Sequence, residues 1–166
     1  MARRLQIEHR VTFWGQVSRR ETLQKVADCD VMLFPSLHDS GGWASIESMA
    51  AGRPVVCLDL GGPAHQVSAE TGFKISADDP CKAIHELAGA LISLAQDPSL
   101  RMRMSIASRK RVQEIFNWRH VGETFEALYQ LNASSKTNAL ALTMEGQINT
   151  LRSRASRGNV SLGRNS

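Results

Sequence analysis

The sequence lacks several features that mark particular classes of protein, and each absence excludes one of those classes. None of the apolar runs in its 166 residues approaches the roughly 20 residues needed to span a bilayer. The start, Met1-Ala2-Arg3-Arg4, is followed by no apolar stretch, so it does not read as a secretory signal. We therefore expect a cytoplasmic protein without a transmembrane segment, with the inner membrane surface as an alternative location.

Cysteine is scarce and scattered. The three cysteines are Cys29, Cys57 and Cys81, and they show no spacing typical of metal ligands. The simplest interpretation is that they are small buried hydrophobic residues in a reducing compartment. We therefore expect no metal site.

The basic excess is confined to one end of the chain, and aromatic residues make up only 5% of the whole. Residues 1–130 carry 15 basic and 15 acidic side chains, whereas residues 131–166 carry 5 basic and 1 acidic. The net charge of +4 therefore belongs to the tail. Because that tail has no aromatic residues among its charges, we expect it to be solvated rather than to bind nucleic acid specifically.

Short apolar runs alternate with helical patterns over the first half of the chain. Strands are predicted at residues 11–14, 31–34, 54–58 and 72–75, and the continuous runs are typical of strands buried on both faces of a parallel sheet. Between them we predict a helix begun by the capping box Ser18/Glu21, a helix near 43–51 ended by Gly52, and a short helix near 64–68. This order predicts an α/β fold, a Rossmann-like parallel sheet with flanking helices.

The second half reads as helical. Asp79-Pro80 and Asp97-Pro98 each look like an N-cap followed by proline at the first helical position, and Asn117 looks like the cap of a third helix. From residue 132 the composition shifts to Ser, Asn, Thr, Arg and Gly. We therefore predict a domain over 1–131 and a basic, largely disordered tail over 132–166, with a short helix around 138–152.

The run from Asp39 to Glu47, DSGGWASIE, contains the clearest functional signal. It places one acid on a loop and another on the first turns of a helix, with two glycines between them. Backbone N–H groups and the positive end of the helix dipole suit a phosphate, and carboxylates accept hydrogen bonds from hydroxyls. Since the loops at 15–18, 35–42 and 59–63 all follow predicted strands, they should gather at one sheet edge as a sugar-nucleotide site.

This run, continued as SMAAGRPVV, resembles the retaining glycosyltransferases of group 1 (family 4). Further shared motifs are Gly61-Gly62, Thr71-Gly72 and Phe116-Asn117-Trp118. The resemblance covers roughly residues 5–130. It implies part of the C-terminal, donor-binding half of a GT-B fold, in which two Rossmann-like halves face each other across a cleft.

The resemblance also implies roles for individual residues. Asp39 falls on the catalytic position that contacts the donor sugar, and Glu47 on the position that binds the ribose hydroxyls. The other donor-binding positions are Ser40, Gly41, Gly42 and Trp43 at the diphosphate, and Gly15 at the start of the loop lining the base. The partners implied are a nucleoside-diphosphate sugar, as substrate rather than cofactor, and a saccharide or lipid-linked acceptor in carbohydrate biosynthesis.

The sequence departs from the family pattern in three ways. Asp39 replaces the usual glutamate, and His65 stands where a glutamate is common. The family's arginine–lysine pair for the leaving diphosphate has no match, and the strands beside it, which would pair between those at 11–14 and 31–34, would precede Met1. The resemblance therefore implies a truncated glycosyltransferase that lacks an N-terminal domain or a partner chain. The alternatives are a catalytically inactive nucleotide-sugar-binding fragment or interaction module, and a sugar-nucleotide epimerase of similar architecture.

Overall fold

The computed structural model describes residues 1–133 and Met144. The chain divides into two compact units, Met1–Asn117 and Trp118–Ser166. The domain boundary suggested by the sequence, at 131/132, lies within a helix that runs over residues 118–133. The tail expected over 132–166, with its helix at 138–152, falls almost wholly outside the described residues.

The first unit is built on a parallel sheet of three strands in the order β1-β2-β3. The strands are β1 (Met32–Phe34), β2 (Val55–Leu58) and β3 (Gly72–Ile75). Met32 pairs with Val55, and Val55 pairs with Gly72. A parallel sheet whose strands alternate with helices confirms the predicted Rossmann-like α/β class.

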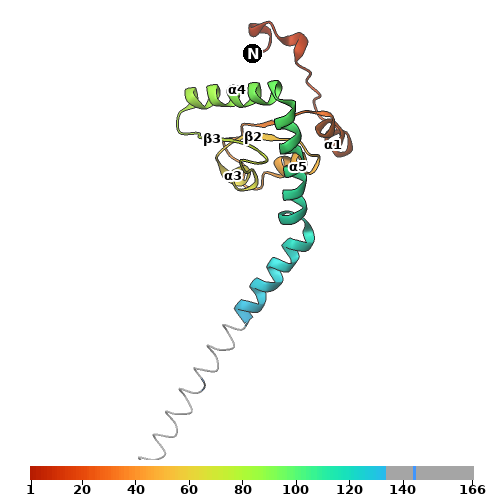
Figure 1. Ribbon diagram of the computed structural model, residues 1–166, viewed down its shortest axis with the longest axis vertical. Helices are drawn as coiled ribbons and strands as arrows, with labels where there is room; N and C mark the ends of the chain where they lie inside the picture. Colours follow the sequence, from red (N-terminus) through yellow and green to blue (C-terminus); the bar gives the residue numbers. More distant parts are fainter. Residues whose placement is uncertain (134–143, 145–166) are drawn as a thin grey trace, which may run out of the picture. The chain divides into compact units, whose positions relative to one another are not determined.

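Helices cover both faces of this sheet, as Figure 1 shows. Helix α4 lies along one face, and α3 lies on the opposite face, where α2 also contacts β1 and β2. Two short 3-10 helices, η1 and η2, precede α1. The bounds of the elements are η1 Arg3–Leu5, η2 Glu8–Arg10, α1 Arg19–Asp28, α2 Trp43–Ala50, α3 Gly61–Gln66, α4 Pro80–Gln96 and α5 Pro98–Ile115.

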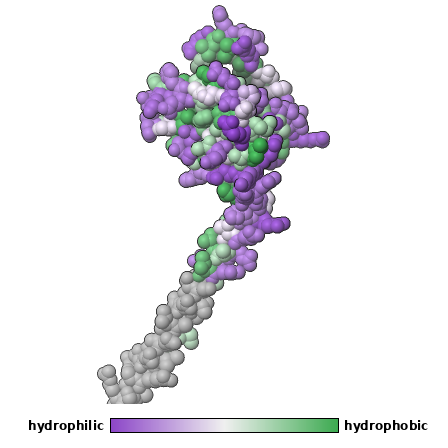
Figure 2. All heavy atoms as spheres, viewed as in Figure 1, coloured by the Kyte–Doolittle hydropathy of each residue, from purple (hydrophilic) through white to green (hydrophobic). Residues whose placement is uncertain are grey.

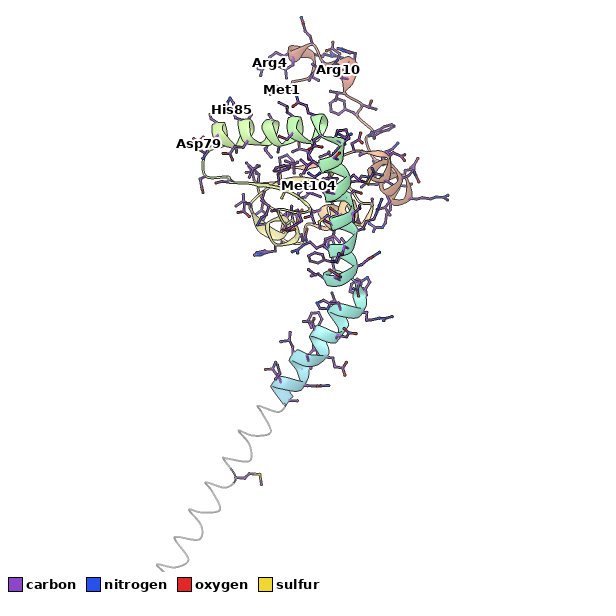
Figure 3. The ribbon with its side chains drawn as sticks, in the orientation of Figure 1. Met1, Arg4, Arg10, Asp79, His85 and Met104 are labelled. Carbon is purple, nitrogen blue, oxygen red and sulfur yellow. The ribbon has the colours of Figure 1, made fainter. Side chains whose placement is uncertain are left out.

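Local signals set the helix ends as predicted. The Ser18 side chain accepts a hydrogen bond from the Glu21 N–H, and the Glu21 carboxylate accepts one from the Ser18 N–H, which forms the capping box of α1. Asp79 and Asp97 cap α4 and α5, each with proline in the first turn. Figure 3 shows Asp79 at the start of α4 and His85 farther along this helix.

The core lies on both sides of the central strand, because all four residues of β2 are buried. On one side Val55 and Cys57 pack against Met49 of α2. On the other side Val56 packs against Leu94 of α4 and Met104 of α5. Each such buried apolar side chain contributes on the order of 1.5–3 kcal/mol relative to exposure.

The strand predicted at residues 11–14 is wrong. Those residues form no strand, and Phe13 and Trp14 are 85% and 60% exposed. A strand needs a neighbour to satisfy its backbone groups, and β1, at the edge of the described sheet, pairs only with β2. Instead, the Lys25 ammonium lies 3.2 Å from the centre of the Trp14 ring.

Two further expectations about the first unit are corrected. The strand β1 is not buried on both faces, because Leu33 is 41% exposed, and the main sheet contacts of α4 are with β2 and β3. The helix α3 begins at Gly61 rather than near residue 64, so the glycine pair forms its first turn. On the face shown in Figure 2, exposed apolar residues are interleaved with hydrophilic ones.

The second unit is described over residues 118–133 and at Met144. Its helix begins at residue 118, one position after Asn117, as the sequence predicts. The Phe125 and Tyr129 rings stack with centroids 6.5 Å apart, one turn from each other on this helix. Among the described residues, no helix is long and apolar enough to cross a membrane.

Candidate nucleotide-sugar site

Two of the three loops that should meet at one sheet edge do follow strands. The segment 35–42 follows β1 and leads into α2, and residues 59–60 connect β2 to α3. Because parallel strands end at the same edge, both connections start from the same edge of the sheet. Hydrogen bonds join the first connection to α3, which the second connection enters. The loop at 15–18 follows no strand, so its place depends on α1 instead.

The Asp39 carboxylate closes the turn that precedes α2. Its Oδ1 accepts a hydrogen bond from the Gly42 N–H at 2.5 Å. The Asp39 carbonyl accepts one from the Gly62 N–H at 3.1 Å, and the Gly41 carbonyl accepts one from the Gln66 side chain at 2.6 Å. The first bond closes the turn itself, and the other two hold this short loop against the start and end of α3.

The glycines of the site are explained first by close packing. A Cβ on Gly62 would lie 2.6 Å from the Ser40 carbonyl oxygen, and one on Gly61 would overlap the Asp39 carbonyl. Gly42 has φ +57°, and a Cβ there would lie 2.7 Å from Gln66 Oε1. The sequence interpretation gave both glycine pairs a ligand-facing role. For Gly61 and Gly62, contact with the backbone of the 35–42 segment is by itself enough to require glycine, whereas a Cβ on Gly41 or Gly42 would meet side chains.

Glu47 lies one turn inside α2 and forms an ion pair with Arg19. The Glu47 Oε1 and Arg19 Nη2 atoms are 2.7 Å apart, and the two side chains are 23% and 75% exposed. Arg19 is the first residue of α1, so this contact joins the 15–18 loop to the site. Sequence analysis missed Arg19, because nothing in its local pattern signals a partner 28 positions away.

The remaining predicted donor-binding residues surround the same turn. Ser40 and Gly41 are exposed, and the Trp43 side chain, on the first residue of α2, is 63% exposed. Gly15 has φ +62° and open space around it. The structure thus brings residues 39–43 and Glu47 together, and it links Gly15 to them only through α1.

The electrostatics of the site combine a helix terminus with two acids. The Ser45 and Ile46 amides in the first turn of α2 already donate to the Gly42 carbonyl. The Ala44 amide has no acceptor within the helix, and the helix dipole adds positive potential there. Asp39 and Glu47 place negative charge on either side of this terminus. Within the described part of the chain, no cluster of three or more His, Cys, Asp or Glu residues could hold a metal ion.

The three cysteines and His65 lie outside the turn from Asp39 to Glu47, whereas His38 belongs to the 35–42 segment that leads into it. Burial, and to a smaller extent the nearby charge of Asp59, raise the pKa of the Cys57 thiol to about 11, although Lys74 acts to lower it. Cys29 and Cys81 are exposed, which corrects the expectation of buried thiols. The His65 side chain is exposed, and the His65 carbonyl accepts a hydrogen bond from Arg111 at 3.1 Å.

Fold and site together define a class: a Rossmann-like α/β unit with an acid-bearing turn ahead of a helix at the carboxyl edge of its sheet. The sequence profile of the family "Glycosyl transferases group 1" matches residues 1–111. The chain belongs to this family, as the sequence motifs indicated.

Individual relatives agree with this assignment. The D-inositol 3-phosphate glycosyltransferase of Corynebacterium diphtheriae is 32% identical over 130 residues, which are 78% of this chain and 29% of the relative. The glycogen synthase of Mycobacterium tuberculosis is 28% identical over 129 residues, which are 77% of this chain and 30% of the relative. The chain thus spans less than a third of the length of either relative.

Solved structures confirm the fold. A sucrose-phosphate synthase from Thermosynechococcus elongatus has a TM-score of 0.67 at 30% sequence identity, over 80% of this chain and 33% of that one. The Anabaena protein Alr3699/HepE, solved in complex with UDP and glucose, has a TM-score of 0.55 at 21% identity, over 76% of this chain and 34% of that one. Both similarities cover only part of the GT-B enzymes concerned.

Proposed function

We propose that this chain provides the donor-binding surface of a retaining glycosyltransferase, which transfers a sugar from a nucleoside diphosphate to a saccharide or lipid-linked acceptor. The observation that carries the proposal is the turn from Asp39 to Glu47, held at the carboxyl edge of the sheet in a chain of this family. A cytoplasmic location, free or at the inner membrane surface, is part of the proposal.

The proposal assigns a different part of the donor to each of the two acids. Glu47 accepts hydrogen bonds from the ribose hydroxyls through the oxygen that Arg19 leaves uncontacted. Asp39 orients the donor sugar, and the first turn of α2 lies against the diphosphate. Such chemistry depends mainly on holding the donor and on stabilising the departing diphosphate electrostatically.

The second candidate is a nucleotide-sugar-binding module without transfer activity. A specific observation favours it: the Gly42 amide, expected at the diphosphate, is donated to Asp39. The pair Gly61-Gly62 is likewise explained by packing against the same loop. Both candidates predict binding of the nucleotide, and only the first predicts turnover.

The test begins with the affinity of the full chain for UDP, GDP and ADP, measured by calorimetry. Glu47→Ala should weaken binding by about 1–3 kcal/mol, because charge-assisted hydrogen bonds are lost. Glu86→Ala is the matched control, since Glu86 pairs with Lys82 on α4, outside the proposed site. An unchanged affinity in Glu47→Ala would remove the ribose assignment.

Release of nucleoside diphosphate from UDP-, GDP- and ADP-sugars then separates the two candidates. Release that depends on Asp39 supports the transferase. Binding with no release, with and without added acceptor saccharides, supports the binding module. Absence of binding to all three nucleotides contradicts both.

A further inference from the structure

The proposed site contains two acids, yet its proposed ligand is an anion. A diphosphate next to Asp39 and Glu47 is repelled by both carboxylates unless a cation balances them. The ion pair recorded at these acids in the described part of the chain is the one between Arg19 and Glu47. Arg19 belongs to none of the motifs that identify the family in the sequence analysis.

The geometry of this pair leaves part of Glu47 available. Arg19 Nη2 contacts Oε1 of the carboxylate at 2.7 Å. The capping box formed by Ser18 and Glu21 fixes the backbone on which Arg19 begins α1. The backbone of Arg19 is therefore held in place by the capping box, and its guanidinium is exposed enough to contact a ligand.

A shallow cavity of about 510 Å³ lies beside the pair. Arg19 and Arg20 line it together with Leu23 and Gln24, all from α1. Both arginines add positive charge to this side of the site, but only the contact of Arg19 with Glu47 is recorded there. The two neighbours therefore form a natural pair for comparison.

We propose that Arg19 is the charge-balancing positioning residue of the nucleotide site. It neutralises Glu47 through Oε1, leaves Oε2 to accept from a ribose hydroxyl, and reduces repulsion between the carboxylates and the diphosphate. This inference rests on the proposed function, because it assigns a partner to the acid of that same site. It adds a residue that the family motifs do not include.

The test compares Arg19→Ala, Arg19→Lys and Arg20→Ala in the full chain, by calorimetry with UDP, GDP and ADP. At low ionic strength Arg19→Ala should lower affinity about 3- to 10-fold, and Arg19→Lys should restore most of it, because charge is the requirement. Arg20→Ala should change affinity less than about 2-fold. In a Glu47→Gln background the effect of Arg19→Ala should fall below about 2-fold, since the carboxylate that Arg19 balances is absent.

Each contrary result has a defined meaning. Equal losses in Arg19→Ala and Arg20→Ala would show general attraction only, and tighter binding in Arg19→Ala would show that Arg19 competes with the ligand. Either result overturns the inference and leaves the proposed function standing. A parent chain that binds none of the three nucleotides refutes the proposed function, and this inference with it. Thermal unfolding of the variants excludes loss of structure as the cause.

Discussion

Replacing Gly62 with alanine tests whether the second glycine pair serves packing. A Cβ there would lie 2.6 Å from the Ser40 carbonyl oxygen and 3.0 Å from the Gly41 carbonyl carbon, well inside ordinary van der Waals contact. Both neighbours are backbone atoms, so the loop itself must move. The Gly62 N–H bond to Asp39 and the Gln66 bond to Gly41 resist that movement.

The size of the effect follows from two opposing terms. Overpacking against backbone costs about 1–3 kcal/mol, whereas alanine in a helix gains at most about 1 kcal/mol over glycine. We therefore expect a net loss of about 1–2 kcal/mol in the free energy of unfolding. With an m-value of about 2 kcal/mol/M, urea unfolding should show a midpoint lower by about 0.5–1 M.

Gly89→Ala is the matched control. Gly89 lies within α4, and a Cβ there would have no neighbour within 4 Å. Replacing Gly89 with alanine should therefore raise the free energy of unfolding by about 0.5–1 kcal/mol, through helix propensity alone. A Gly62→Ala chain as stable as its parent, or one that shifts together with Gly89→Ala, would refute the packing explanation.

Two further predictions concern the start of α1 and the buried thiol. Ser18→Ala should lower the free energy of unfolding by about 1 kcal/mol in urea titrations at pH 7. The Ser18 hydroxyl, and then the Ser18 N–H, lower the pKa of the Glu21 carboxyl below its ordinary value by bonding to the ionised form. The stabilisation that comes from the ionised Glu21 carboxylate is therefore present above the unfolded-state pKa and is lost as the pH falls through the folded-state value. In a thiol titration at pH 8, Cys29 and Cys81 should react at once and Cys57 only on unfolding, because Cys57 is buried with a pKa raised to about 11. Rapid labelling of all three thiols in the native chain would contradict that assignment.

The correct parts of the sequence prediction rest on local signals. The capping box at Ser18, the Asp-Pro starts of α4 and α5, and the apolar run of β2 each specify their own geometry within a few residues. A hydrogen bond between Ser18 and Glu21 needs no information from elsewhere in the chain. Element type and parallel order were therefore predictable.

The errors fall where the outcome depends on distant residues. Residues 11–14 have strand propensity, but a strand exists only beside a partner, and β1 pairs with β2 alone. Leu33 has the pattern of a buried residue but is exposed, because burial depends on which helix packs on its strand, and the main sheet contacts of α4 are with β2 and β3. The Arg19–Glu47 pair and the contact of Gly62 with Ser40 are likewise tertiary, so no local pattern reveals them.

The turn before α2 also limits how its expected roles can be combined. One Asp39 oxygen is already used by the Gly42 amide, so Asp39 can orient a donor sugar only with its other oxygen or after releasing the turn. If it releases the turn, the Gly42 amide becomes available for a diphosphate at the same time. The two roles assigned to Asp39 and Gly42 are therefore coupled. Either both residues turn to the ligand together, or the Asp39–Gly42 bond persists and the anion is bound at the Ala44 amide, with the charge of Glu47 balanced by Arg19.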